Sequence, residues 1–192
     1  MTKGKTGLRL ALKQTIKTEI MAQPAFNELL LQTAFSCMAS DGDIDQSEVQ
    51  LIKSLENDEQ LFGFENIENE LNRLVKEINQ NGHDFLREYL HHLSQSDLTE
   101  KQEIQIVRTA VKTIKADNDE KYSEIKFFKI IRSKLSGSNK TLIEALPEFK
   151  NLEEDYLQQD IISESYLEKL TADYFDKHDI TEFAPIELDS NE

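Results

Sequence analysis

Two acidic turns, 76 residues apart, limit the folds that are open to this chain. The first turn, Ala39–Glu48, places four carboxylates within eight residues, and the second turn is Lys115–Glu124. With this offset, residues 33–53 and 109–129 are identical at seven of 21 positions, where background frequencies give about one. The identical pairs are Thr33/Thr109, Ala34/Ala110, Asp41/Asp117, Asp43/Asp119, Ser47/Ser123, Glu48/Glu124 and Lys53/Lys129. This pattern predicts an internal duplication of a helix–acidic turn–helix unit.

Apolar residues recur at helical spacing on both sides of each turn, and no segment before Pro147 alternates strictly as a strand would. Pro24 is the only proline before Pro147. The sequence therefore predicts an all-α fold, a bundle of about seven helices built from two pseudo-two-fold related halves. The expected helices cover approximately 8–20, 25–40, 45–57, 64–79, 85–93, 97–117 and 122–135.

Charge divides the chain into two parts. The net charge is −15 over 192 residues. Residues 148–192 hold 14 acidic residues and three lysines, so they contribute −11 of that total. We expect a helical domain over 1–147 and an acidic C-terminal extension over 148–192 that is partly helical or disordered.

The acidic balance also restricts the partners. Phosphate backbones and anionic membranes would be repelled, which argues against nucleic acid and favours cations or the basic surface of a protein partner. No apolar run is long enough to span a membrane, and the basic N-terminus lacks the apolar core of a signal peptide, so a cytoplasmic location is expected. Cys37 has no internal partner and is expected to be a small buried hydrophobe. No pattern specifies an oligomeric state.

The paired turns resemble those of the TerB-like family, named for tellurite-resistance proteins and related to the N-terminal module of a membrane-anchored DnaJ-type co-chaperone. The family pattern is an apolar helix, a small residue, Asp-Gly or a close variant, and a Glu at the start of the next helix, repeated once. Here the copies are Ala39–Glu48 and Ala116–Glu124, and Asn118 replaces the glycine in the second. The resemblance covers about 25–136. It implies an all-helical pseudo-two-fold bundle, divalent-metal binding by the shared acids, and a role in bacterial stress response through partners.

Crowded carboxylates repel each other unless something compensates. Oxygen ligands suit Ca²⁺ or Mg²⁺, and we expect a cation site shared by the two halves. The turn is not an EF-hand, because position 46 is not glycine and Ile52 stands where a bidentate Glu would be needed. The predicted ligands are Asp41, Asp43, Glu48, Asp117, Asp119 and Glu124.

Two alternatives need no metal. Asp45 and Glu48 have the spacing of a capping box, and acids at a helix N-terminus are stabilised by the helix dipole. Lys53 and Lys129, which recur after each Glu, could instead neutralise the acids as ion pairs.

Three functions remain open at this point. The first is a non-catalytic module that binds a divalent cation, a protein partner or both through the acidic turns. The second is a protein–protein adaptor whose turns are structural and whose acidic tail docks a basic partner. The third is a metal-dependent phosphoester hydrolase. It is the least favoured of the three because no nucleophile or general base stands out. We therefore expect no enzymatic activity.

Overall fold

The computed structural model describes residues 25–117, 121–149, 151–157, 164–177, 180 and 182–186. The expected helix over 8–20 and the predicted ligand Asp119 lie outside these residues. Within them the all-α prediction is confirmed, since every regular element is helical. In chain order the elements are α2 (Phe26–Met38), η1 (Ala39–Asp41), α3 (Gln46–Glu59), α4 (Ile67–Asn81), α5 (His83–Gln95), α6 (Glu100–Ile114), α7 (Tyr122–Arg132), α8 (Asn139–Ala145), η2 (Glu153–Leu157) and α9 (Glu164–Lys177).

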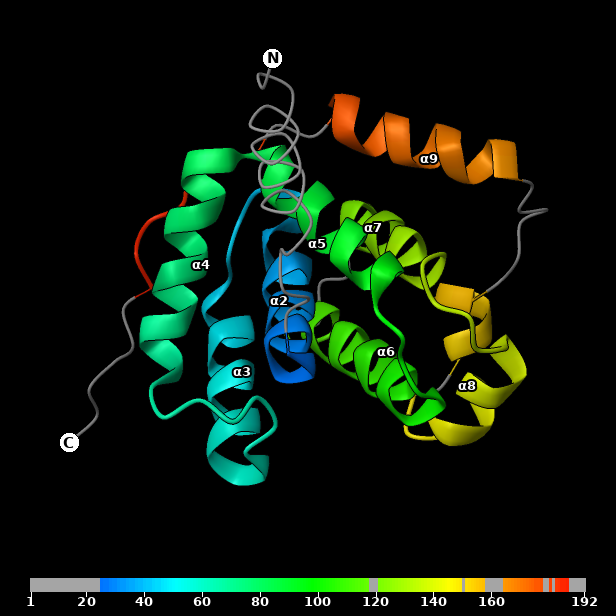
Figure 1. The fold of residues 1–192 in the computed structure, drawn as a ribbon, viewed down its shortest axis with the longest axis horizontal. Helices are drawn as coiled ribbons and strands as arrows, with labels where there is room; N and C mark the ends of the chain where they lie inside the picture. Colours follow the sequence, from blue (N-terminus) through cyan, green and yellow to red (C-terminus); the bar gives the residue numbers. More distant parts are fainter. Residues whose placement is uncertain are drawn as a thin grey trace, which may run out of the picture.

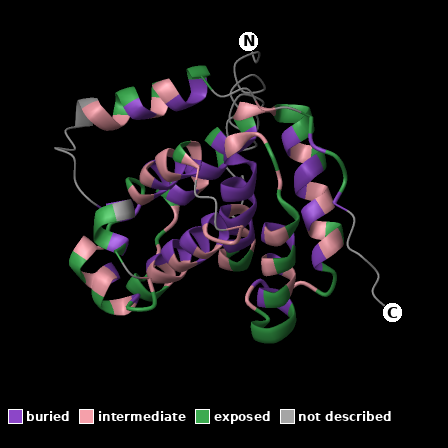
Figure 2. Cartoon of the chain, turned by 180° about the vertical axis from the view of Figure 1, so that it is seen from behind, coloured by how far each residue is buried: buried purple, intermediate pink, exposed green. Residues whose placement is uncertain are grey.

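Helix α2 lies at the centre of the molecule and contacts α4, α5, α6 and α7 (Figure 1). Every residue from Leu29 to Met38 except Gln32 is buried, so α2 appears almost wholly purple in Figure 2. A helix that is buried on all sides forms the core of a bundle. The Thr33 hydroxyl is satisfied there, because it donates to the Leu29 carbonyl at 2.8 Å and accepts from the Tyr89 hydroxyl at 2.9 Å.

The two predicted hairpins form, and their ends follow local chemistry. The η1 turn ends at Gly42, whose φ of +89° is a left-handed conformation that favours glycine. Asp45 caps α3 as predicted and accepts the Ser47 amide at 2.7 Å. Helix α6 starts later than predicted, with Thr99 as its N-cap, because the Gln102 carboxamide accepts the Thr99 amide at 2.9 Å. This Thr-x-x-Gln pair sets the start of α6 after the predicted start at 97.

Helix α4 also starts later than predicted, at Ile67. The buried Glu56 carboxylate accepts the backbone amides of Phe62, Gly63 and Phe64 at 2.8, 3.1 and 2.7 Å. These bonds hold the residues before α4 in a loop, and Gly63 adopts a φ of +72° there. A carboxylate that receives three amides stabilises this loop strongly.

Parts of 148–192 pack on the rest of the bundle. Helix α9 lies along α7, and its buried Tyr174 hydroxyl donates to the Ser40 carbonyl at 2.6 Å. Residues 182–186 run beside α4 (Figure 1). Helix α8, which the sequence did not predict, is capped by Ser138 and buries Leu142.

Candidate functional site

The acidic turns of the two halves meet beside the end of α2. The η1 turn contacts α7, so the first turn lies against the helix that follows the second. Asp41 stands at the end of η1 and Glu48 in the first turn of α3, whereas Asp117 follows α6 and Glu124 lies in the first turn of α7. Both glutamates are only 5% exposed. The duplicated pattern therefore brings buried carboxylates from both halves into one cluster.

Glu48 and Glu124 make the same contact, each in its own half. The Oε2 atom of Glu48 accepts the Asp45 amide at 3.1 Å, and that of Glu124 accepts the Lys121 amide at 2.7 Å. Each glutamate thus satisfies a free amide at the start of its helix. The Oε1 atom of Glu48 is buried and has no hydrogen-bond partner within the described part of the chain. Helix capping therefore accounts for one oxygen of Glu48 and leaves the other unexplained.

Lys121 supplies a positive charge to the cluster. Its ammonium pairs with Asp41, which lies 80 residues earlier in the chain and whose side chain is 8% exposed. Asp41 also accepts the Asp43 amide at 2.9 Å, which tightens the turn. The pKa of Lys121 is raised by its hydrogen bond to Asp41. Lys121, at the start of α7, thus neutralises an acid of the first turn.

Burial also opposes ionisation of the two glutamates. Burial raises the pKa of Glu48 to about 8, and the nearby Glu124, Asp41 and Asp117 add to that increase. Burial raises the pKa of Glu124 to about 7, with further contributions from Asp41 and Asp117. A carboxylate that is both desolvated and close to other carboxylates ionises late. The two glutamates therefore titrate as coupled groups near neutral pH.

The six predicted ligands do not all occupy equivalent positions. Asp41, Glu48, Asp117 and Glu124 lie within electrostatic reach of one another. Asp43 is exposed, and its carboxylate accepts the Ile44 amide at 3.0 Å. Within the residues that the structure describes, no three His, Cys, Asp or Glu side chains are already arranged as a metal-ion site.

Sequence patterns missed two contributors to this site. Lys121 occupies the position of Asp45 in the first copy, and the sequence pattern assigns it no role in the site. Across the described residues Lys53 forms no ion pair, whereas Lys121 does. Tyr174 on α9 contacts Ser40 in the first turn, 134 residues earlier in the chain. No local sequence pattern predicts such a contact. Cys37 is buried as expected, and its thiol lies near Glu48 and Glu124.

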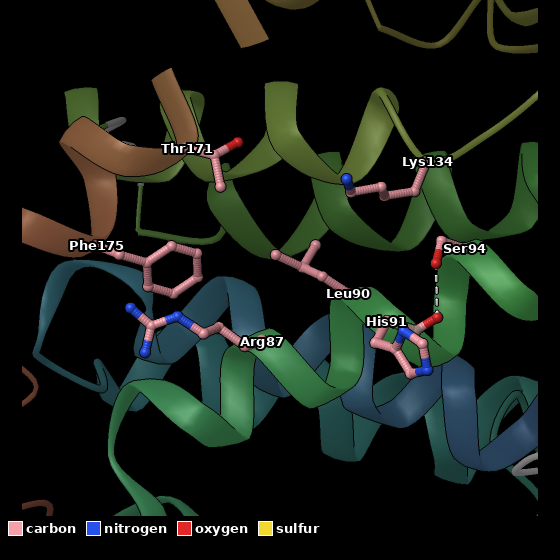
Figure 3. Close-up of a pocket in the computed structure, with 7 residues that line it drawn as sticks. All are labelled: Arg87, Leu90, His91, Ser94, Lys134, Thr171 and Phe175. Atoms are coloured by element: carbon pink, nitrogen blue, oxygen red, sulfur yellow. Dashed lines mark hydrogen bonds between the residues drawn. The ribbon is translucent and has the colours of Figure 1, made fainter. Parts of the chain in front are cut away.

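A second concave surface lies between α5, the end of α7 and α9, and it encloses about 300 Å³ (Figure 3). Arg87, His91 and Lys134 are among the residues that line it, and Arg87 stacks on Phe175 with 4.4 Å between its guanidinium carbon and the ring centroid. The same guanidinium pairs with Asp84 at 3.0 Å. Because Arg87 is engaged twice, we assign no function to this cavity.

Comparison with known proteins identifies no relative: no family model matches the chain, and no curated protein or solved structure matches it either. The TerB-like resemblance therefore stays a prediction. No helix in the described ranges is both long enough and apolar enough to cross a bilayer.

Proposed function

We propose that this protein is a non-catalytic, TerB-like binding module of a bacterial stress-response system, and that its paired acidic turns bind a divalent cation. The observation that carries the proposal is the buried, unpartnered Oε1 atom of Glu48 inside a cluster of four carboxylates from both halves. A buried polar atom without a partner is costly, and a bound cation would remove that cost. The oxygen-only ligand set favours Ca²⁺ or Mg²⁺ over zinc.

Binding would exchange charges that the cluster already holds. Glu48 and Glu124 would lose their protons, and Lys121 would leave Asp41, so that these carboxylates could turn toward the cation. Asp43, which is exposed, and Asp119, which lies outside the described residues, complete the proposed ligand set. Because the protons compete with the cation, affinity would rise with pH.

A pseudo-two-fold relation between the halves is part of this proposal. Besides Glu48 and Glu124, a second pair of positions 76 residues apart, Asn27 and Glu103, makes similar contacts. A Cβ atom on Gly63 would meet the Asn27 side chain at 2.8 Å, and one on Gly137 would meet the Glu103 side chain at 2.5 Å. In both halves the first helix thus supports the loop that follows the second helix.

The experiment is thermal unfolding of the full chain with Ca²⁺ or Mg²⁺, and with EDTA, at pH 8. We expect the cation to raise the midpoint, because a ligand that prefers the folded state stabilises it by about 2.7 kcal/mol at 100 times Kd. The Asp41→Asn/Asp117→Asn variant should lose this response, and the matched Asp58→Asn/Asp97→Asn variant, which changes two exposed acids, should keep it. A wild-type unfolding midpoint that is the same in Ca²⁺, Mg²⁺ and EDTA would refute the cation site.

The second candidate is an adaptor in which the turns are purely structural. The pairing of Lys121 with Asp41 and the capping by both glutamates favour it, since they stabilise the turns without a guest. This candidate predicts that cations leave the unfolding midpoint unchanged. It also predicts that the Asp41→Asn/Asp117→Asn variant still captures a basic protein partner. The least favoured candidate, a hydrolase, would require activity on a phosphoester panel that the Asp41→Asn/Asp117→Asn variant loses.

A further inference from the structure

Residues 182–186 are held along α4 by their backbone. Asn79 donates to the Phe183 carbonyl at 2.8 Å and accepts the Phe183 amide at 2.9 Å. Asn72 makes the same pair of bonds with Ile186, at 3.1 Å to the carbonyl and 2.9 Å from the amide. Each carboxamide therefore completes both hydrogen bonds of one backbone unit, as a neighbouring strand would.

The spacing of the two contacts fits an extended chain. Asn72 and Asn79 are seven residues apart on α4, which places them on one face with about 10 Å between them. Three residues of extended or polyproline chain span about 9–10 Å, which matches the step from Phe183 to Ile186. Pro185 lies between the two contacts, where its missing amide removes no hydrogen bond and its ring favours the extended form. The segment runs antiparallel to α4 (Figure 1).

Only two side chains of the segment act as anchors. Phe183 and Ile186 are each 7% exposed, whereas Glu182, Ala184 and Pro185 are exposed. Hydrogen bonds to the backbone do not distinguish one residue type from another. Selectivity for a peptide sequence would therefore come from the two anchor side chains. The segment thus presents an aromatic residue followed, three positions later, by an aliphatic one.

The segment fills its groove incompletely. One cavity of about 580 Å³ lies between the segment and α4, lined by Val75 and Lys76. Another of about 440 Å³ lies between the segment and the first acidic turn, lined by Ile44 and Val49. A peptide with larger side chains beside the same two anchors would bury more surface in this groove.

We propose that this groove between α4 and the first acidic turn is a docking site for an extended peptide of a partner protein, and that Phe183–Ile186 is a resident competitor. The partner peptide carries an aromatic residue and an aliphatic residue three positions later, and it displaces the resident segment. This role does not require a cation at the acidic cluster, although Asp43 of the first acidic turn lines one edge of the groove.

The test measures fluorescence polarisation of a labelled peptide with the sequence of residues 180–188 against the full chain. In the wild type the resident segment competes at an effective concentration of about millimolar, so binding in trans is weak. The Phe183→Ala/Ile186→Ala variant should bind the peptide at least 10-fold more tightly. Adding Asn72→Ala/Asn79→Ala to that variant should abolish binding, whereas the matched Asn69→Ala/Asn81→Ala changes on the same helix should not.

A peptide with alanine at both anchor positions should not bind. Equal or absent binding to the wild type and the anchor variant, with folding verified by circular dichroism, would overturn the proposal. A measurement on the wild type covers the case in which the variant unfolds: excess peptide should accelerate hydrogen exchange at the Phe183 and Ile186 amides, and unchanged exchange would refute displacement. A concentration-dependent dimer that exchanges these segments reciprocally would replace the partner by a second copy and also overturn the assignment.

Discussion

Lys121 pairs with Asp41 across the two halves of the chain, and the pair joins the N-terminus of α7 to the end of η1. The Asp41 side chain is 8% exposed, so its charge depends on this partner. The lysine is 41% exposed and already partly hydrated, so it can move into solvent at small cost. The contact is therefore suited to being replaced by another cation.

We expect Lys121→Gln to lower the free energy of unfolding by about 1–2 kcal/mol in EDTA, because Asp41 is left buried without a counter-charge and solvent screens part of the original pair. In Ca²⁺ the same variant should recover stability and bind the cation more tightly than the wild type. Chemical denaturation in both conditions measures this, with Lys140→Gln as an exposed control. A variant that is equally destabilised with and without Ca²⁺ would show that Lys121 and the cation do not compete.

Stability should fall as pH rises through neutrality in EDTA. Burial raises the pKa of Glu48 to about 8 and that of Glu124 to about 7, against 4.5 for a free glutamate. Between these limits the folded state binds more protons than the unfolded state, so the free energy of unfolding decreases with pH. Lys121 stays charged over this range and moderates the loss.

We expect a decrease on the order of 2–5 kcal/mol between pH 5.5 and pH 8.5, measured by urea titration. Glu48→Gln should flatten the pH dependence, and the exposed Glu59→Gln control should not. A free energy of unfolding that increases over this interval would contradict the assigned protonation of the cluster.

Glu56 should be important for the loop between α3 and α4. Its carboxylate accepts three amides, and Glu56→Gln leaves a single acceptor oxygen beside them. We expect a loss of about 2–3 kcal/mol, since buried amides without partners are costly. Thermal or urea unfolding measures it against Asp58→Asn, an exposed change on the same helix, and an unchanged midpoint would show that the loop does not depend on this carboxylate.

Tyr174→Phe tests how firmly α9 holds the first acidic turn. The variant removes the hydroxyl that donates to the Ser40 carbonyl and keeps the ring, so a loss of about 1 kcal/mol is expected. The half-buried Tyr166, also on α9, provides the matched control as Tyr166→Phe. Faster hydrogen exchange around Gly42 in the first variant alone would locate the effect in the turn, and equal exchange in both would place Tyr174 outside the support of the site.

The sequence predicted those features of the fold that depend on residues close together in the chain. The Asp45 cap, the turn at Gly42 and the helices on either side follow from spacing and from backbone preferences within a few residues. Helix α8 is not predicted by the sequence pattern, although Ser138 caps a new helix soon after the predicted end at 135. The start of α6 depended on the Thr99–Gln102 cap, and the start of α4 depended on the contacts of Glu56 with the preceding loop.

Long-range contacts could be predicted only where the duplication indicated them. Glu48 and Glu124, which align in the two copies, each accept the amide three residues earlier, whereas Lys121 stands where the copies differ and its pairing with Asp41 has no counterpart in the aligned residue Asp45. The contacts of Asn72 with Ile186 and of Tyr174 with Ser40 join residues 114 and 134 apart, and no periodic pattern connects them. Such contacts depend on how helices pack, which a single sequence does not specify.

Cys37 is the sole cysteine of the chain, and its fully buried thiol lies beside the two glutamates that come from opposite halves. Burial raises the pKa of this thiol well above its usual range, so the native fold protects it from alkylation. Any event that parts the halves would expose the sulfur to reagent. The rate at which an ordinary thiol dye reacts with the unmodified protein therefore reports how often the halves separate, and the measurement requires no introduced label.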